Sequence, residues 1–209
     1  MKIFKENNLT VVYTEKSDGN MRLKENRKKV LEKFGFDDVY LPKQEHTNIV
    51  APFVNMSAPA DGLYTDLKRV PIGVLTADCM AIVLTDFNGL VVLHAGWKGL
   101  VNGIIQNGLK YFKDGAKFAF ISPSIRSCCY EVGKEFYDIL KEKGIDTDYL
   151  TERDGRVYFD LQRLANDILR ENGVERIIDM NLCSKCGENI FSYRNGNFDE
   201  RILTFAFLE

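Results

Sequence analysis

Two histidines, His46 and His94, are the only imidazoles in the chain, and each lies where core packing does not readily explain it. His46 falls in residues 41–70, the longest stretch without clear periodicity. His94 ends an apolar segment and is followed by Ala95-Gly96-Trp97, where a strand gives way to a turn and a helix. Strand ends that feed helices commonly carry ligand and catalytic groups in α/β proteins. Both histidines are therefore candidates for chemistry.

Cys79 joins them through a predicted hairpin. The segments Ala81–Thr85 and Leu90–Leu93 are apolar and rich in β-branched residues, and Asn88-Gly89 between them is a turn dipeptide. A turn there pairs residues whose numbers sum to about 175 to 177, so Cys79 and His94 emerge at the same open end. They need a bulge or bend near Asp78-Cys79 to meet directly. His46 must arrive from the long loop.

A thiolate and two imidazoles form a three-ligand set of the zinc type, and the fourth position would stay open for water or substrate, as in catalytic zinc sites. The spacing matches no compact zinc motif. Two alternatives stay open on these residues alone, a Cys-His nucleophilic dyad and a chance set of unrelated core and surface side chains.

The other cysteines carry weaker signals. Cys183 and Cys186 have the CxxC spacing of a redox pair or half a zinc knuckle, but no second CxxC or histidine follows, so a structural or incidental role is expected. The neighbours Cys128 and Cys129 are not expected to share one metal and are interpreted as core residues. Five cysteines, two of them adjacent, favour reduced thiols over a disulfide framework.

Charge and hydropathy exclude several classes of partner. The formal net charge of −2 provides no global positive field for a nucleic-acid backbone. A small anion could still bind locally, and Arg194 and Lys98 are the candidates to hold one, although Lys98 alone is also an ordinary surface charge. No segment has the length and apolar character of a signal peptide or a membrane span, so we expect a cytoplasmic protein without a membrane partner.

Periodicity predicts one mixed α/β (α+β) domain over residues 1–209. The expected strands are Leu9–Thr14, Ile72–Leu75, Ala81–Thr85, Leu90–Leu93, Lys117–Ile121, Val174–Ile178 and Ile202–Phe207. The expected helices are Met21–Phe34, Lys98–Phe112, Glu131–Lys143 and a last one that Asp160 caps and that runs to Asn172. The apolar runs in the middle lack polar alternation, which indicates strands covered on both faces.

Several motifs together resemble the YfiH-like laccase-domain family. They are, in order, Lys43-Gln44-Glu45-His46, Ala60-Asp61-Gly62-Leu63, Leu75-Thr76-Ala77-Asp78-Cys79, His94-Ala95-Gly96-Trp97-Lys98-Gly99, Cys128-Cys129-Tyr130-Glu131-Val132-Gly133 and Phe191-Ser192-Tyr193-Arg194. That family was first described as multicopper polyphenol oxidases and is now understood as purine nucleoside phosphorylases that also deaminate adenosine. The resemblance implies an α/β sandwich, also likened to cysteine hydrolases, with metal ligands at His46, Cys79 and His94.

The leading hypothesis is thus a zinc-dependent enzyme, with copper possible, that acts on a purine nucleoside and phosphate. The resemblance extends the substrate site to Gln44, Asp61, Asp78, Lys98 and Arg194. Lys98 stands where the family motif usually has arginine, and residues 122–127 replace a glycine-rich stretch, which leaves anion contacts and substrate preference open. Residue types do not determine the oligomeric state.

Three other functions are weighed against it. Cys79 and His94 could form the dyad of a thiol hydrolase or amidase. Two histidines are far too few for a multicopper cluster, but they suffice for a polyphenol oxidase with a single copper and Met80 as a weak axial ligand, although Met80 is expected to point into the core. A non-catalytic metal-binding module is the third.

Overall fold

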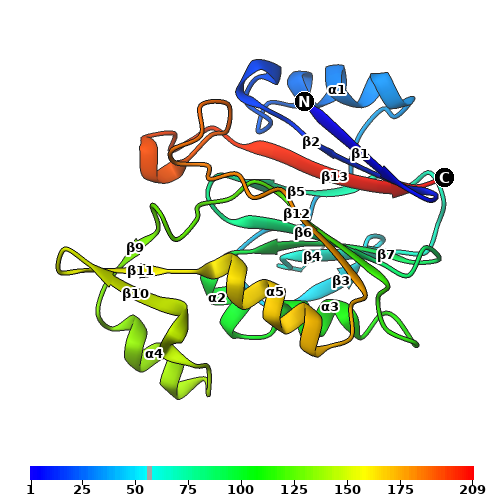
Figure 1. Ribbon diagram of the computed structural model, residues 1–209. Helices are drawn as coiled ribbons and strands as arrows, with labels where there is room; N and C mark the ends of the chain where they lie inside the picture. Colours follow the sequence, from blue (N-terminus) through cyan, green and yellow to red (C-terminus); the bar gives the residue numbers. More distant parts are fainter. Residues whose placement is uncertain (56–57) are drawn as a thin grey trace.

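The computed structural model describes residues 1–55 and 58–209, and two stacked β-sheets dominate it (Figure 1). The first has the strand order β1 (Lys2–Glu6), β2 (Leu9–Tyr13), β13 (Ile202–Leu208), β5 (Ile72–Thr76). The second has the order β12 (Arg176–Asp179), β8 (Phe118–Ile121), β6 (Met80–Thr85), β7 (Leu90–Ala95), β4 (Gly62–Thr65), β3 (Val50–Pro52). The expected mixed α/β sandwich is confirmed.

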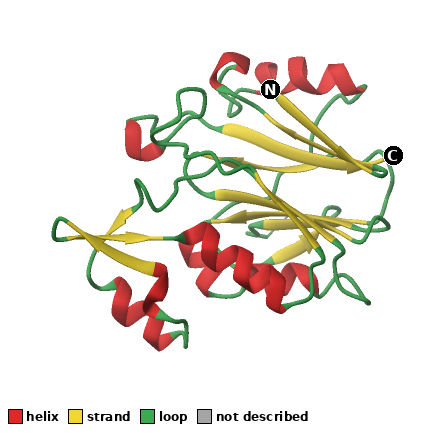
Figure 2. Cartoon of the chain, viewed as in Figure 1, coloured by secondary structure: helices red, strands yellow, loops and turns green. Residues whose placement is uncertain are grey.

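Helices cover the outer faces of both sheets (Figure 2). Helix α1 (Lys24–Leu31) packs on the first sheet, and α2 (Trp97–Val101), α3 (Ile104–Leu109) and α5 (Leu161–Glu171) pack on the second. A side lobe holds α4 (Phe136–Glu142) and a small sheet of β10 (Leu150–Arg153), β11 (Arg156–Phe159) and β9 (Glu131–Val132). Short 3-10 turns span Lys16–Asp18, Glu32–Phe34, Thr147–Tyr149 and Tyr193–Asn195. No helix of the described residues has the length and apolar character to cross a membrane.

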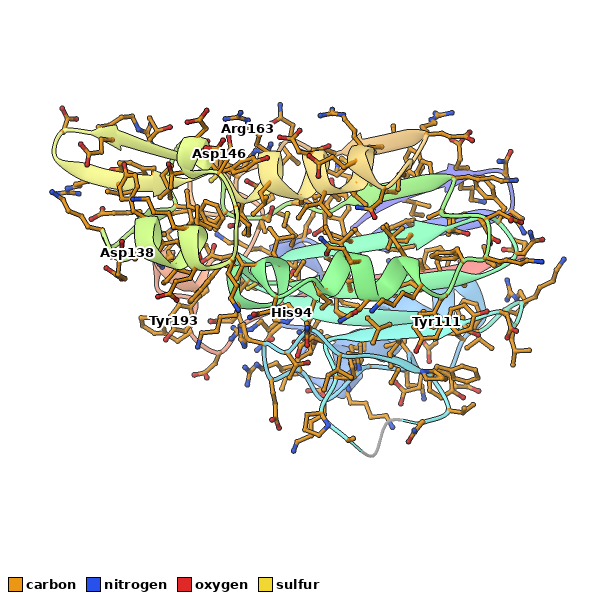
Figure 3. The ribbon with its side chains drawn as sticks, turned by 90° about the horizontal axis from the view of Figure 1, so that it is seen from below. His94, Tyr111, Asp138, Asp146, Arg163 and Tyr193 are labelled. Carbon is orange, nitrogen blue, oxygen red and sulfur yellow. The ribbon has the colours of Figure 1, made fainter. Side chains whose placement is uncertain are left out.

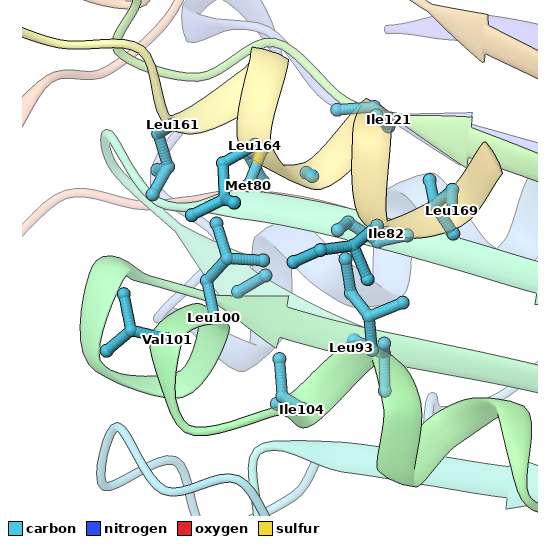
Figure 4. Close-up of a cluster of buried hydrophobic side chains, with 14 of the residues drawn as sticks. Met80, Ile82, Leu93, Leu100, Val101, Ile104, Ile121, Leu161, Leu164 and Leu169 are labelled. Carbon is cyan, nitrogen blue, oxygen red and sulfur yellow. The ribbon is translucent and has the colours of Figure 1, made fainter. Parts of the chain in front are cut away.

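Both faces of the central strands are buried, as their unbroken apolar runs predicted. In β6, Val83 faces the core between the sheets, whereas Ile82 faces the core under α3 and α5. Met80, Leu93 and Leu164 meet in that second core (Figure 4). Successive residues of a strand point to opposite faces, so two buried faces require consecutive apolar residues.

The predicted hairpin forms as β6 and β7. Met80 pairs with Ala95 and Ala81 pairs with His94, which is the expected register. Asp86 stabilises the turn, because its Oδ1 accepts hydrogen bonds from the backbone N–H groups of Asn88 and Gly89. The open end of this hairpin carries the candidate site.

Three predicted helices were wrong in extent. The expected helix Lys98–Phe112 is divided into α2 and α3, because Gly103 adopts a left-handed φ of 87° between them. The expected helix Glu131–Lys143 begins only at Phe136, because Glu131 and Val132 pair with β11 instead. The helix predicted from Met21 starts at Lys24. Asp160 caps α5 as expected, accepting from the backbone N–H of Arg163 at 3.0 Å.

The stretch 41–70 is less irregular than its sequence indicated. It contains β3 and β4, which pair with each other in parallel and extend the second sheet through β7. Met56 and Ser57 of this stretch lie outside the described residues. The pairing brings residues 45–47 to the open end of the β6–β7 hairpin, where their backbone N–H groups bind the Asp61 carboxylate.

Candidate active site

The side chains of His46, Cys79 and His94 converge, with one ligand atom of each lying within 4.8 Å of the others. Cys79 Sγ lies 4.0 Å from His46 Nε2, and the two imidazole ring centroids are 4.9 Å apart. The backbone bend predicted before Cys79 is present, because Asp78 has a φ of 87°. The structure thus brings together the three residues that the sequence singled out.

Asp61, the residue before β4, organises this group. Its fully buried carboxylate lies 2.7 Å from His94 Nδ1, and that contact leaves Nε2 to face the site. The same carboxylate accepts hydrogen bonds from the backbone N–H groups of Glu45, His46 and Thr47. These bonds hold the loop while His46 adopts a left-handed φ of 58°. A carboxylate that orients an imidazole in this way commonly supports a metal ligand.

The electrostatics of the site favour ionised groups. Burial alone would raise the pKa of Cys79, but the His94 charge and hydrogen bonds from both histidines lower it to about 6. Burial alone would lower the pKa of His94, but the Cys79 thiolate and the Asp61 carboxylate raise it to about 9. Without a metal, the neutral-pH state is therefore a thiolate beside an imidazolium.

Two glycines allow the loop that carries His46 to lie close to the start of α2. A Cβ on Gly96 would lie 2.9 Å from Cys79 Sγ and 3.1 Å from His46 Cδ2, so a side chain there would enter the site. A Cβ on Gly99 would lie 2.9 Å from the carbonyl oxygen of Thr47. The spacing Gly96-Trp97-Lys98-Gly99 thus lets the first turn of α2 pack against the loop that carries His46.

A pocket of about 810 Å³ opens over the three side chains, a size suited to a small organic ligand. Its walls come from several segments, and in Figure 3 His94 and Tyr193 mark two of them. The residues lining it are Arg22, Pro42, Gln44, His46, Leu75, Ala77, Asp78, Cys79, His94, Trp97, Ile125, Tyr130, Leu161, Tyr193, Arg194 and Arg201.

The other predicted site residues are placed differently. Gln44 and Arg194 line the pocket, although the Gln44 amide is engaged in two hydrogen bonds with the backbone of Leu75. Asp78 lines it too, but its carboxylate accepts from Ser184 Oγ and the Arg194 backbone N–H. Lys98 is not among the lining residues of the described chain, and its Nζ lies 5.7 Å from the Trp97 ring centroid.

Sequence reasoning missed Arg22 and Arg201. Both line the pocket, and burial together with the neighbouring Arg22 charge lowers the pKa of Arg201. They are far apart in sequence and adjoin segments that carry many other charges, so residue type alone gave no signal. Two neighbouring guanidinium groups repel each other, and an anion between them would relieve that repulsion.

The structure brings the remaining four cysteines together. Cys128 and Cys186 are exposed, and the sulfur atoms of Cys128, Cys129, Cys183 and Cys186 all lie within 4.8 Å of one another. The CxxC pair therefore has two partners that precede it in the chain. Of the adjacent pair, Cys129 packs against the core as expected, whereas Cys128 is exposed and does not.

The donor set at His46, Cys79 and His94 fits a metal of the zinc class. One thiolate and two imidazoles are available at an accessible pocket, and Asp61 fixes the orientation of one imidazole. An axial bond from Met80 to copper is not supported, because the Met80 side chain is fully buried in the apolar core. That placement agrees with the expectation from sequence.

The sequence is similar to those of proteins named as purine nucleoside phosphorylases and an adenosine deaminase. A purine nucleoside phosphorylase of Aquifex aeolicus is 40% identical over 176 residues, which cover 81% of this chain and 82% of that protein. The adenosine deaminase RL5 of an unknown prokaryotic organism is 32% identical over 179 residues, covering 74% and 68%.

Solved structures and a family model extend the match to nearly the whole chain. A Neisseria meningitidis protein superimposes with a TM-score of 0.87 at 23% identity, covering 98% of this chain and 96% of that one. A Bacillus licheniformis protein named YfiH gives a TM-score of 0.84, also at 23% identity, covering 96% and 93%. The family model described as multi-copper polyphenol oxidoreductase laccase matches residues 2–208. The chain therefore belongs to this laccase-domain family, whose YfiH-type members are named purine nucleoside phosphorylases.

Proposed function

We propose that the protein is a metal-dependent purine nucleoside phosphorylase whose centre is His46, Cys79 and His94. The observation that carries this proposal is the convergence of the three side chains at a pocket that arginines also line. A metal of the zinc class would be held by these three residues and would supply a Lewis acid that polarises a substrate oxygen. The names of the relatives support the substrate class.

Three guanidinium groups give the pocket its preference for phosphate. Arg22, Arg194 and Arg201 line it, and the planar guanidinium can hold two phosphate oxygens at once. Arg194 is fixed in place, because its Nη1 donates to the carbonyl oxygen of Glu131 at 2.9 Å. Tyr193, half exposed on the same segment, offers an aromatic face to a purine ring.

In this reaction the protein positions the phosphate and the nucleoside and forms no covalent bond to either. A phosphate oxygen forms a bond to C1′ of the ribose as the bond from C1′ to the purine nitrogen breaks. The electron pair of the broken bond passes to the purine, which takes up a proton. The arginines hold the attacking anion near C1′, and the pocket walls orient the nucleoside. The products are the free base and the sugar 1-phosphate.

Inosine tests the proposal directly. Incubation of the full chain with inosine and phosphate is expected to release hypoxanthine and ribose 1-phosphate, and omission of phosphate should stop the release. Adenosine and methylthioadenosine complete the panel. Chromatography of the products measures the reaction. Absence of turnover with every nucleoside in zinc-loaded protein would rule the proposal out.

Deamination of adenosine is proposed as a side activity of the same pocket, supported by the relative named adenosine deaminase. It would release inosine and ammonia and need no phosphate. The nucleoside panel separates the two reactions by their dependence on phosphate.

Arg22 can be replaced to test the anion site without disturbing the hydrophobic core, because its side chain is exposed at the pocket. Arg22→Ala is expected to raise the KM for phosphate about tenfold, the effect of losing one charged hydrogen bond. Steady-state kinetics with varied phosphate measure it. Arg170→Ala, which removes an exposed arginine paired with Asp167, is the matched control and should leave KM unchanged. An unchanged KM in both variants would remove Arg22 from the phosphate site.

A second candidate function rests on the arrangement of the Cys79, His94 and Asp61 side chains. A thiolate beside an imidazolium that a carboxylate orients is also the arrangement of a thiol hydrolase. Such an enzyme keeps its activity in chelator and loses it to an alkylating reagent. The phosphorylase is expected to lose activity in chelator and regain it with zinc.

A further inference from the structure

We propose that Cys128, Cys129, Cys183 and Cys186 form a second, structural metal site that holds Zn²⁺ with four thiolates. The four sulfur atoms lie within 4.8 Å of one another, and they come from two segments that are distant in sequence. This group, the four-cysteine cluster, is separate from the three residues at the pocket. It is independent of the proposed function.

The sulfur spacing matches the edge of a zinc tetrahedron. A zinc–sulfur bond of about 2.3 Å gives a sulfur–sulfur separation of about 3.8 Å in a tetrahedral site. In the structure, Cys128 Sγ lies 3.7 Å from Cys129 Sγ and 3.8 Å from Cys186 Sγ. All four cysteines are free thiols. Four soft sulfur ligands in this shape favour zinc over hard cations such as magnesium or calcium.

The backbone turns tightly between Cys183 and Gly187, and the sulfur atoms of Cys183 and Cys186 lie within 4.8 Å of each other. The turn closes where Gly187 N–H donates to the Cys183 carbonyl oxygen at 2.9 Å. A Cβ on Gly187 would lie 2.5 Å from that oxygen, so this turn requires glycine.

Cys128 and Cys129 can both belong to the four-cysteine cluster because the backbone forms a tight turn at these residues. The N–H groups of Cys129 and Tyr130 both donate to the carbonyl oxygen of Arg126 at 2.8 Å. The side chain of Arg126 pairs with Asp179, at 2.8 Å between Nη1 and Oδ1, so the two segments are also joined beside the cluster.

The cluster lies where it can brace the pocket. Tyr130, next to Cys129, lines the pocket, and Ser184, next to Cys183, donates to Asp78 at 2.6 Å. Protein sulfurs fill all four positions, so no ligand position remains for substrate, which is the pattern of structural zinc. We therefore assign the cluster to holding the two segments together.

Metal content of purified variants tests this assignment. With zinc in both sites, the full chain is expected to hold about two zinc ions, and Cys79→Ala, which removes a pocket ligand, about one. Cys79→Ala combined with Cys186→Ser should hold none. Lys185→Ala, in the same turn with all four thiols intact, is the matched control and should keep both metals.

Cobalt gives a second measurement that needs no cluster variant, in case Cys186→Ser does not fold. Chelator-stripped Cys79→Ala titrated with Co²⁺ should bind one equivalent and develop the intense charge-transfer absorption of tetrahedral cobalt with four thiolates. Zinc should then displace the cobalt and protect four thiols from alkylation, measured by mass spectrometry. No cobalt binding by Cys79→Ala, an iron centre, or a disulfide among these cysteines in the protein as purified would overturn the assignment.

Discussion

Cys79→Ala is expected to lower the rate of phosphorolysis about a thousandfold, because loss of a metal ligand removes several kcal/mol of transition-state stabilisation. The substitution removes one sulfur atom at a pocket, and His94 keeps its contact with Asp61. The fold should therefore persist. Initial rates with inosine and phosphate measure the loss, and circular dichroism checks the fold.

Removal of the metal with a chelator shows whether the effect of Cys79→Ala comes from loss of a metal ligand. If Cys79 is a metal ligand, removing the metal from the unaltered chain should cause a loss similar to that of Cys79→Ala, and zinc should restore the rate only in the unaltered chain. A Cys79→Ala protein that still cleaves inosine at the original rate contradicts the proposal. Activity that chelator leaves untouched and alkylation abolishes favours the thiol hydrolase.

Asp61→Asn is expected to lower the free energy of unfolding by about 3 kcal/mol and the affinity for zinc at the pocket about 10- to 100-fold. The carboxylate is fully buried and accepts from three backbone N–H groups in addition to its contact with His94. An asparagine amide offers one acceptor oxygen, and its NH2 group would face donors. Urea unfolding and competition with a chelating dye measure the two effects.

The effect of Asp61 on stability should depend on pH in a defined direction. Burial raises the pKa of Asp61, but bonds from His94 and Thr47 outweigh it and lower the pKa from 3.8 to about 2. A depressed pKa contributes stability that is fully present above the unfolded value and is lost as the pH falls through the folded value. The difference between the unaltered chain and Asp61→Asn should thus be full at neutral pH and shrink below about pH 4. Asp66→Asn, at an exposed position nearby, should show neither effect.

Local signals explain which parts of the site could be predicted. The β6–β7 hairpin follows from a turn dipeptide between two apolar runs, so its register and the meeting of Cys79 with His94 could be inferred from neighbouring residues. Gly103 lies in a segment whose apolar residues have helical spacing. No local sequence pattern indicates its left-handed φ, which divides α2 from α3. Helix boundaries are decided by such single residues.

The other parts of the site depend on contacts between residues that are distant in sequence. The position of His46 relies on the Asp61 carboxylate, and its loop can be placed only once β4 pairs with β7. Arg22 and Arg201 reach the pocket from opposite ends of the chain. In the same way, Cys128 and Cys186 meet only because β8 and β12 are neighbouring parallel strands, which brings together the segments that follow them. His46 could be singled out as one of only two histidines, and the family resemblance then implied its role as a metal ligand.

Strand β13 has a consequence for how the protein is made. It follows every other strand in sequence, yet it lies between β2 and β5 inside the first sheet. A ribosome must therefore translate nearly all of the described chain before that sheet can close. Arg194 and Arg201, which wall the pocket, emerge in the same late stretch. The nascent chain consequently has no finished pocket during most of its synthesis, and the first sheet has to form after translation has passed β13.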